Sequence, residues 1–326
     1  DEQGNKSNAL LGYFIAGDFI YREDGRPSTN MNGLYKSKDD YLSFVEANPL
    51  RPSGLGQGTY TNASDAGYDQ FETIKTTQNT SNYSVNLSAK IDVRTTETIN
   101  LTFGGSFAYN RGRAYNFNAS MFNYDNNPQN TNYTWRVFGR FSQRFPTASD
   151  SKSFVKNVYY SIQADWTQNY GFTQDAKHKD DLFKYGYVGQ FDVYKDKNYT
   201  LGTDTVNGEI FEDVQIMDNI FDTLWQFNRR EINPIVANYT DAYYDIYPDN
   251  EFQRTADDIQ AFGGLLNGQT PPGIYGMWSA PGTILSGYNV TDNNQLSIGA
   301  SGAMDLGNHE LKFGFQYEQR FDRSYG

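Results

Sequence analysis

Apolar and polar residues alternate along several long stretches of this chain. Every second residue from Tyr83 to Val93 is apolar, and the same pattern restarts at Ile99 and runs to Asn110. A period of two over about eleven residues, repeated after a short gap, predicts two long antiparallel strands joined as a hairpin. Strands of soluble sheets are usually about five or six residues long. The length of these strands therefore raises the question of what their apolar face touches.

The same alternation recurs elsewhere and predicts an antiparallel all-β fold. The expected long strands are Leu11–Tyr21, Asn82–Val93, Ile99–Asn110, Tyr133–Phe145, Val158–Phe172, Gln295–Leu306 and Glu310–Phe321. When they are numbered in order, the short links all fall at one end and the long links at the other. The short links are Arg94–Thr98, Pro146–Lys156 and Gly307–Asn308, and the long links are Arg22–Ser81, Arg111–Asn132 and Thr173–Asn294. One rim with short links and an opposite rim with long links are typical of outer-membrane β-barrels, whereas a soluble sandwich mixes its loop lengths.

The length of the strands also fits a membrane. About eleven residues at roughly 3.3 Å each, tilted near 40°, rise about 28 Å, close to the thickness of the hydrocarbon layer. Aromatic residues gather at strand ends, where an aromatic girdle would lie; they include Tyr109, Tyr133, Trp135, Phe145, Tyr159 and Tyr160. The apolar face is therefore expected to contact lipid through residues such as Val85, Leu87, Ile91, Leu101 and Phe103.

Composition agrees with an apolar surface that is thin and alternating. Only 37% of the 326 residues are apolar, yet 16% are aromatic, with 26 Tyr and 23 Phe. No apolar run approaches the length of a transmembrane helix. A barrel strand turns only every second residue toward lipid, so its mean hydropathy is low. The net charge of −12 argues against nucleic acid as a partner. The chain has no cysteine, which excludes disulfides and thiolate metal sites.

Motifs for catalysis are absent, so neither an enzyme nor a catalytic or cofactor site is expected. The chain has no P-loop, nucleophile elbow or HExxH motif. The two histidines, His178 and His309, lie far apart and are interpreted as exposed turn residues. Acidic pairs such as Asp39–Asp40 and Asp257–Asp258 leave a structural calcium ion in the loops as an alternative to simple solvated charge.

Three arginines stand on the polar side of one expected strand. Arg136, Arg140 and Arg144 repeat at a spacing of four. One interpretation is a basic strip in a lumen, used for an anionic substrate or for docking a plug. The other is a set of ion pairs with Asp92, Asp165 and their neighbours, because a lumen must balance its charge.

The long link Thr173–Asn294 is expected to fold outside the membrane. It is rich in Pro and Gly but carries aromatic clusters, in which disordered segments are poor. It is predicted to form an extracellular cap with its own small core, including a ribbon that pairs Phe183–Val193 with part of Gln215–Asn228. The clustered aromatics would contact a ligand or partner, or would merely pack the loops together; they are Trp225, Phe227, Tyr243, Tyr244 and Tyr247.

A short helix is expected only at Asp39–Ala47, capped by Ser37 or Asp39.

Several segments resemble a known family. The hairpin YSVNLSAKIDVRTTETINLTFGGSFAYN, at positions 83–110, is similar to barrel hairpins of TonB-dependent outer-membrane receptors, especially the SusC-like and carboxypeptidase-regulatory-domain-bearing branch of Bacteroidota. MFNYDNNPQNTNYTWRVFGRFSQRF (Met121–Phe145) and INPIVANYTDAYYD (Ile232–Asp245) are similar too. The resemblance implies a barrel of about 22 strands, an N-terminal plug, and nutrient import driven through TonB. It also implies contact with lipopolysaccharide and with a SusD-like or other surface lipoprotein.

The sequence departs from the family pattern in its extent. No plug, TonB box or regulatory domain is recognised, and about seven strands do not close a barrel of even strand number. Residues 1–326 are therefore expected to be an internal fragment of a bacterial outer-membrane barrel, with 173–294 as an excursion and TonB reached only through segments outside this chain. Three functions remain open: a transporter wall, a barrel that serves as scaffold or interaction subunit, and a soluble secreted glycan-binding β-protein.

Overall fold

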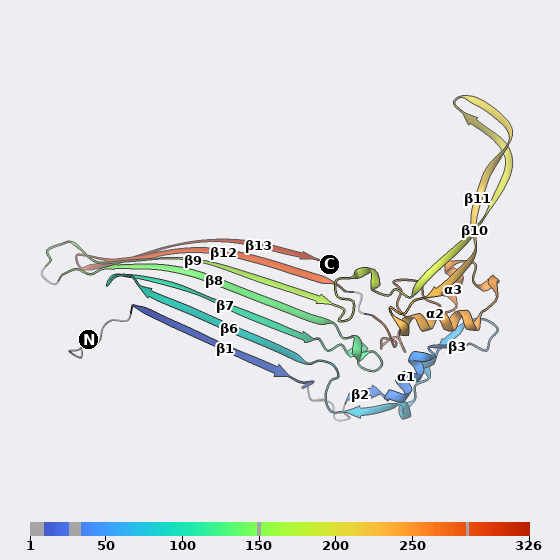
Figure 1. The fold of residues 1–326 in the computed structure, drawn as a ribbon, viewed down its shortest axis with the longest axis horizontal. Helices are drawn as coiled ribbons and strands as arrows, with labels where there is room; N and C mark the ends of the chain where they lie inside the picture. Colours follow the sequence, from blue (N-terminus) through green and yellow to red (C-terminus); the bar gives the residue numbers. More distant parts are fainter. Residues whose placement is uncertain (1–9, 26–33, 149–150, 285–286) are drawn as a thin grey trace.

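One large antiparallel sheet dominates the computed structural model, which describes residues 10–25, 34–148, 151–284 and 287–326. Its strands lie side by side in Figure 1, with a smaller helix-containing part at one end. The strands follow the order β1-β6-β7-β8-β9-β12-β13. Their bounds are β1 (Leu11–Arg22), β6 (Asn82–Arg94), β7 (Ile99–Arg113), β8 (Gln129–Phe145), β9 (Val155–Gln174), β12 (Asn289–Leu306) and β13 (His309–Tyr325).

Every long strand expected from the alternation is confirmed, most of them longer by a few residues. All neighbouring pairs are antiparallel, as a meander of hairpins requires. Among the described residues, β1 and β13 each pair with a single neighbour, so the sheet is open and this chain does not close a barrel. The expected antiparallel β class is correct for the sheet, and the closed barrel remains a prediction.

Short and long connections lie at opposite ends of the sheet, as the sequence predicts. The described residues of the short links 95–98, 146–154 and 307–308 lie together at the end of the sheet where β1 begins (Figure 1). The described residues of the long links 23–81, 114–128 and 175–288 lie at the other end. These three long connections fold together into one small body, which we call the cap.

The cap mixes helices with short strands. Its elements are β2 (Leu34–Ser37), α1 (Asp39–Ala47), β3 (Leu50–Pro52), β4 (Thr59–Thr61), β5 (Phe71–Ile74), α2 (Pro234–Ile246) and α3 (Ala256–Ala261), with 3-10 turns η1 (Asn62–Asp65), η2 (Tyr68–Gln70), η3 (Phe117–Ala119), η4 (Tyr124–Asn126), η5 (Leu182–Lys184) and η6 (Asn250–Phe252). Strand β2 pairs with β5, and β3 pairs with β4.

The helices correct two expectations. The helix Asp39–Ala47 has the expected bounds, but its N-cap residue is Lys38 and no side chain caps it, so the Ser37 or Asp39 cap is wrong. Helix α2 has 13 residues and was not expected. Pro234 at its first position fits a helix start. Its buried residues recur at helical spacing; they are Val236, Ala237, Tyr239, Thr240 and Tyr243.

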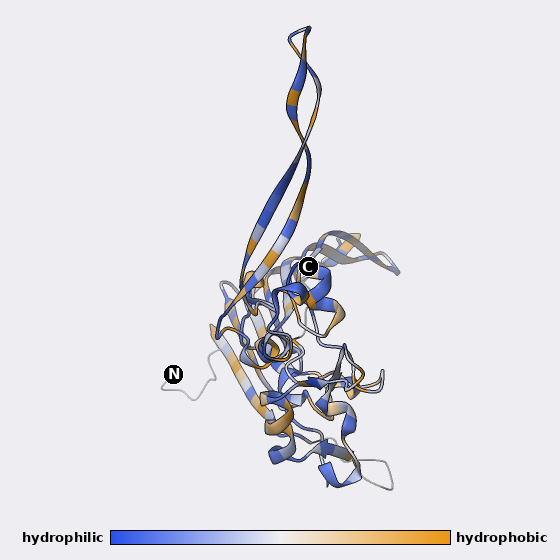
Figure 2. Ribbon diagram, turned by 90° about the vertical axis from the view of Figure 1, so that its right-hand side faces the viewer, coloured by the Kyte–Doolittle hydropathy of each residue, from blue (hydrophilic) through white to orange (hydrophobic). Residues whose placement is uncertain are grey.

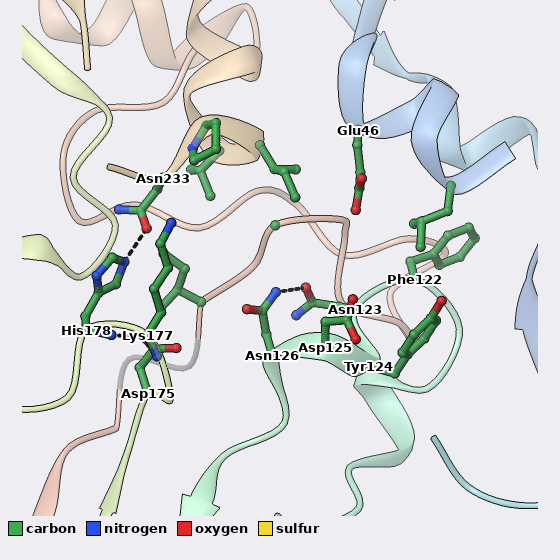
Figure 3. Close-up of a pocket in the computed structure, with 16 residues that line it drawn as sticks. Glu46, Phe122, Asn123, Tyr124, Asp125, Asn126, Asp175, Lys177, His178 and Asn233 are labelled. Atoms are coloured by element: carbon green, nitrogen blue, oxygen red, sulfur yellow. Dashed lines mark hydrogen bonds between the residues drawn. The ribbon is translucent and has the colours of Figure 1, made fainter. Parts of the chain in front are cut away.

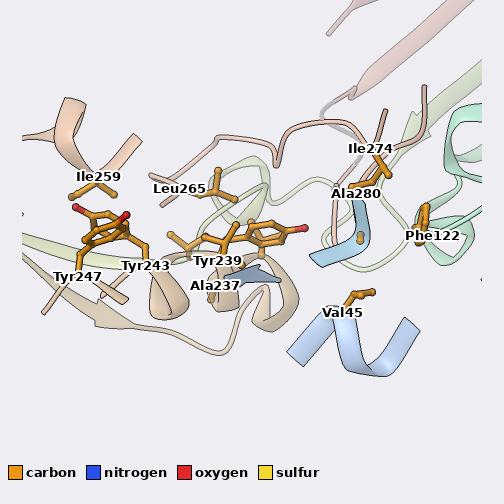
Figure 4. Close-up of a cluster of buried hydrophobic side chains, with 14 residues drawn as sticks. Val45, Phe122, Ala237, Tyr239, Tyr243, Tyr247, Ile259, Leu265, Ile274 and Ala280 are labelled. Atoms are coloured by element: carbon orange, nitrogen blue, oxygen red, sulfur yellow. The ribbon is translucent and has the colours of Figure 1, made fainter. Parts of the chain in front are cut away.

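The core of the protein lies in the cap, and all three long connections supply it. Val45 of the first connection, Phe122 of the second and Tyr239 of the third are fully buried or nearly so (Figure 4). Hydrogen bonds cross between connections as well: Asn238 Nδ2 donates to the Glu46 carbonyl at 2.6 Å, and Tyr247 Oη donates to the Gly58 carbonyl at 2.8 Å. The expected cap core is therefore shared and does not belong to residues 173–294 alone.

A long two-stranded ribbon extends from the cap. Strands β10 (Gly189–Val206) and β11 (Glu209–Arg229) turn at Asn207–Gly208 and stand clear of the remaining chain (Figures 1 and 2). The expected pairing is confirmed at the base, where Val193 lies opposite Trp225. The expected start at Phe183 is wrong, because Phe183 belongs to η5 and is 94% exposed.

Candidate functional site

The register places the expected lipid-facing residues on one face of the sheet. Leu87 lies opposite Phe107, Ile91 opposite Phe103, and Leu101 opposite Val93. Val85 shares this face, opposite Tyr109. The face continues across the other strands through Ile15, Phe19, Val137, Ile162, Trp166, Leu296, Ile298, Phe313 and Phe315.

This apolar face is open to its surroundings. Leu87 is 50% exposed and Phe103 is 55% exposed. Trp135, Val137, Ile162, Phe313 and Phe315 are exposed on the same face. A contiguous apolar surface on this scale marks contact with a membrane or with another protein. The sharing of one face is thus confirmed, whereas contact with lipid stays a prediction.

A row of tyrosines lies along the edge of the apolar face that is nearest the cap. The ring centroids of Tyr83 and Tyr109 lie 5.6 Å apart, those of Tyr109 and Tyr133 4.9 Å apart, and those of Tyr133 and Tyr170 6.4 Å apart. The hydroxyls of Tyr83 and Tyr109 are 3.2 Å apart, within hydrogen-bond distance. Rings with an apolar body and a polar tip prefer the boundary between hydrocarbon and water.

The arginine strip lies on the opposite, polar face, and each arginine has a partner. Arg136 Nη2 is 3.6 Å from Asp165 Oδ1, Arg140 Nε donates to Gln163 Oε1 at 2.8 Å, and Arg144 lies over the Tyr159 ring at 5.7 Å. The expected ion pair with Asp165 is therefore present.

The expected direct ion pair between the strip and Asp92 is not among the ion pairs of the described residues. Asp92 is paired with Lys90 at 2.8 Å and accepts a hydrogen bond from Thr102 at 2.7 Å. Arg136 and Arg140 instead border an open hollow of about 850 Å³ whose wall also contains hydroxyl and amide side chains, among them Ser161, Gln163, Gln295, Ser297, Ser301 and Gln316.

A second hollow on the polar face lies nearer the cap and was not predicted. It measures about 520 Å³, and its polar lining consists of amides and hydroxyls from β8, β9 and β12: Asn130, Asn132, Thr134, Asn169, Thr173, Asn289 and Thr291. Thr134 Oγ1 donates to Asn169 Oδ1 and Thr173 Oγ1 to Asn130 Oδ1, both at 2.8 Å. The sequence signal that could have revealed this hollow is the presence of Asn or Thr at every second position of 130–134.

The clustered cap aromatics hold the ribbon onto α2. Tyr244 Oη donates to the Trp225 carbonyl at 2.5 Å, and burial raises the pKa of Tyr244 to about 12. The rings of Phe191 and Phe227 lie 5.1 Å apart, and those of Phe227 and Tyr244 lie 5.7 Å apart. These contacts favour the packing interpretation of the cluster.

Two members of that cluster are unavailable to a ligand. Tyr243 is 0% exposed, and its hydroxyl donates to the Phe252 carbonyl. Tyr247 is also buried, with its hydroxyl bound to the Gly58 carbonyl. The expectation that these two side chains contact a ligand or partner is wrong, because they form the inside of the cap.

The cap contains a pocket of about 210 Å³ whose wall combines polar and apolar side chains (Figure 3). Glu46 enters it from α1, Asn123 and Asn126 come from the second connection, and Lys177 and His178 come from the segment after β9. Burial, followed by the nearby Asp125 charge, raises the pKa of Glu46 above its ordinary value. Sequence reasoning did not bring these residues together.

His178 departs from its expected role. It is buried, its Nε2 lies 2.6 Å from Asn233 Oδ1, and its backbone N–H donates to Asp175 Oδ1 at 2.7 Å. The expected turn is confirmed for His178, but the expected exposure is wrong. His309 is exposed, at the start of β13. The buried imidazole joins the segment after β9 to the start of α2.

In the described part of the chain, no three His, Cys, Asp or Glu residues gather into a group that could hold a metal ion. No helix of this part combines the length and hydropathy needed to cross a membrane. Comparisons of the chain with family models, curated proteins and solved structures found no match.

Proposed function

We propose that this chain forms part of the wall of a bacterial outer-membrane β-barrel of the TonB-dependent transporter type, which imports a hydrophilic nutrient. The observation that carries the proposal is the difference in polarity between the two faces of the sheet. One face is apolar and open across all its strands, with Leu87 and Phe103 half exposed. The other bears Arg136, Arg140 and hollows lined by amides and hydroxyls. A lipid-facing outside and a polar lumen require this arrangement.

Energetics favour a partner for the apolar face. Removing apolar surface from water stabilises a protein by about 25 cal/mol per Å². The apolar face spans seven strands, so covering it would add a large stabilisation. Lipid would cover the face without a further layer of protein. The tyrosine row would then lie at the outer boundary of the hydrocarbon, on the same rim as the cap.

The open edges of the sheet support a larger barrel. In the described part of the chain, the outer edges of β1 and β13 have no paired strand. Unpaired backbone N–H and C=O groups cost several kcal/mol each in hydrocarbon, so membrane sheets close on themselves. Further strands from the larger polypeptide would complete the wall, with the short links in the periplasm and the cap outside.

Membrane fractionation of the full-length polypeptide tests the proposal. We expect it in the outer membrane, extracted only by detergent, with uptake of one nutrient lost on deletion of the gene. Recovery of the full-length protein as a soluble monomer without detergent would contradict the proposal. That result would favour the soluble glycan-binding alternative. A TonB box and plug upstream of this chain would support energised transport over a passive barrel.

The ribbon supports a second candidate, a barrel that acts as an interaction subunit. Beyond its base, the ribbon exposes apolar side chains on both strands, including Leu201 at 70% and Ile210 at 69%. A two-stranded hairpin is only marginally stable alone, so a partner such as a surface lipoprotein would stabilise it. Purification of the intact complex, with and without the distal ribbon, separates this function from transport alone.

A further inference from the structure

Arg111 is the first charged residue on the apolar face of β7. Leu101, Phe103, Phe107 and Tyr109 precede it at alternate positions, and the β7 register runs without a bulge. Arg111 lies opposite Tyr83 on β6, just beyond the tyrosine row. Its position two residues past Tyr109 corresponds to about 7 Å along the strand. The guanidinium is therefore at the height where lipid headgroups would meet the barrel.

Only neutral groups hold this guanidinium. Its Nη1 donates to Tyr83 Oη at 3.3 Å and its Nη2 donates to Gln129 Oε1 at 2.9 Å. Within the described ranges, no carboxylate forms an ion pair with Arg111. By contrast, Arg229 of the ribbon base is paired with both Glu231 and Asp241.

A shortage of carboxylates does not explain the missing partner. The chain has 39 Asp and Glu against 27 Lys and Arg. A guanidinium has five N–H donors in a planar fork, and two bonds to neutral acceptors fix its orientation while leaving donors for an anion. Planar, charge-assisted recognition of this kind matches the oxygens of a phosphate.

We propose that Arg111 binds the phosphate of an anionic lipid headgroup, with the adjacent tyrosine row packing against the lipid beneath it. This inference rests on the proposed function, since it requires lipid on the apolar face. Tyr83 positions the guanidinium through its hydroxyl. Gln129, which is itself buried, holds it from the cap side. The site would anchor the barrel at a fixed depth on the cap side of the membrane.

The test compares the full-length polypeptide in nanodiscs of neutral phosphatidylcholine and in nanodiscs that also contain phosphatidylglycerol. Native mass spectrometry measures retained phosphatidylglycerol, and thermal melting measures the stabilisation that it confers. We expect Arg111→Gln to weaken retention about fivefold, the factor that corresponds to about 1 kcal/mol for one arginine at an anionic surface. Arg111→Lys should keep part of the retention, because it keeps the charge.

Arg140→Gln is the matched control, since it removes the same charge from the polar face and should leave retention unchanged. Equal retention by wild type and Arg111→Gln would overturn the inference. So would equal stabilisation by inorganic phosphate in neutral nanodiscs, because the anion would then not be a lipid. If Arg111→Gln fails to fold, a wild type that gains nothing from phosphatidylglycerol still refutes the site. Failure of the wild type to enter any nanodisc would instead refute the proposed function and the site together.

Discussion

Leu87 of β6 lies directly opposite Phe107 of β7, and both side chains stand on the open face of the sheet. If this face contacts lipid, Leu87→Arg places a charge in hydrocarbon. We expect a loss of about 2–4 kcal/mol in the free energy of unfolding if Leu87 lies near the bilayer midplane. Leu101→Arg should be less costly, because Leu101 lies nearer the short-link rim. Urea unfolding from phospholipid vesicles measures both losses.

The neighbouring residue provides the control for this prediction. Asn86 points to the other face, where its Nδ2 donates to Asp18 Oδ2 at 2.9 Å. Asn86→Arg adds the same charge next to an existing carboxylate, so a much smaller loss is expected. Equal losses at positions 86 and 87 would contradict a sheet with lipid on one side only.

Protease accessibility should differ between the two rims. A protease recognition sequence inserted at Thr96, in a short link, should resist protease added to intact cells. The same sequence inserted at the ribbon turn Asn207–Gly208 should be cut, because the ribbon projects from the cap. Cleavage at position 96 in intact cells would reverse the orientation. Lysed cells, in which both sites should be cut, provide the control.

The sheet was predictable because each of its strands carries its own signal. The alternation of residues such as Leu87 and Asn86 sets both the strand and the face, and a slip of one residue would exchange the two faces. The shared face of Val85, Leu87, Ile91, Leu101 and Phe103 followed from this pattern alone. The ion pair of Arg136 with Asp165 also followed, since the two residues lie on the polar face of adjacent strands.

The cap was less predictable because contacts distant in sequence determine it. The α2 segment contains three Tyr, two Ile, one Val and one Thr, all of which favour strands by local propensity. Burial in the same core as Val45 and Leu265 overrides that propensity. His178 carries no local sign of burial, because its partner Asn233 is 55 positions away. The cap pocket likewise gathers residues from all three long connections.

The cap core should depend strongly on Tyr243. Its ring is fully buried among Tyr244, Tyr247 and Ile259. Truncation of a large buried ring leaves a cavity, so Tyr243→Ala should destabilise the cap by about 3–5 kcal/mol. Limited proteolysis of the cap, or hydrogen exchange of α2, measures this loss. Phe183→Ala removes an exposed ring and should change stability by less than about 0.5 kcal/mol; similar losses for both variants would contradict the observed core.

Stability of the cap should fall as the pH rises past the ordinary value for glutamate. Burial of Glu46, followed by the Asp125 charge, raises the pKa of Glu46 above the usual 4.5. The folded cap then holds this proton more tightly than the unfolded chain, so folding is favoured below 4.5 and loses that advantage as the pH rises through the raised pKa. Melting of the cap across this range should show the loss in wild type and not in Glu46→Gln. Glu97→Gln, at the opposite rim, should keep it, and an unchanged slope in Glu46→Gln would refute the assignment.

The distal ribbon can be removed without touching the cap core. Deletion of residues 202–282 would also remove α2 and α3, so loss of function in such a variant would show only that the cap had unfolded. Replacement of residues 197–220 by Asn-Gly instead closes the paired residues Asp196 and Phe221 with a two-residue hairpin turn. The ribbon base stays attached, because Tyr244 still binds the Trp225 carbonyl.

We expect this shortened variant to insert into the membrane and to keep the thermal stability of the cap, since the removed residues pair with each other along the ribbon and none of them belongs to the buried cap core. If the ribbon binds a partner, co-purification of the complex should be lost while the barrel remains, and uptake should fall with it where transport requires that partner. The matched control replaces only the turn Asn207–Gly208 by Gly-Asn and should preserve the complex. Undiminished uptake together with an intact complex in the shortened variant would show that the exposed apolar residues of the distal ribbon carry no function.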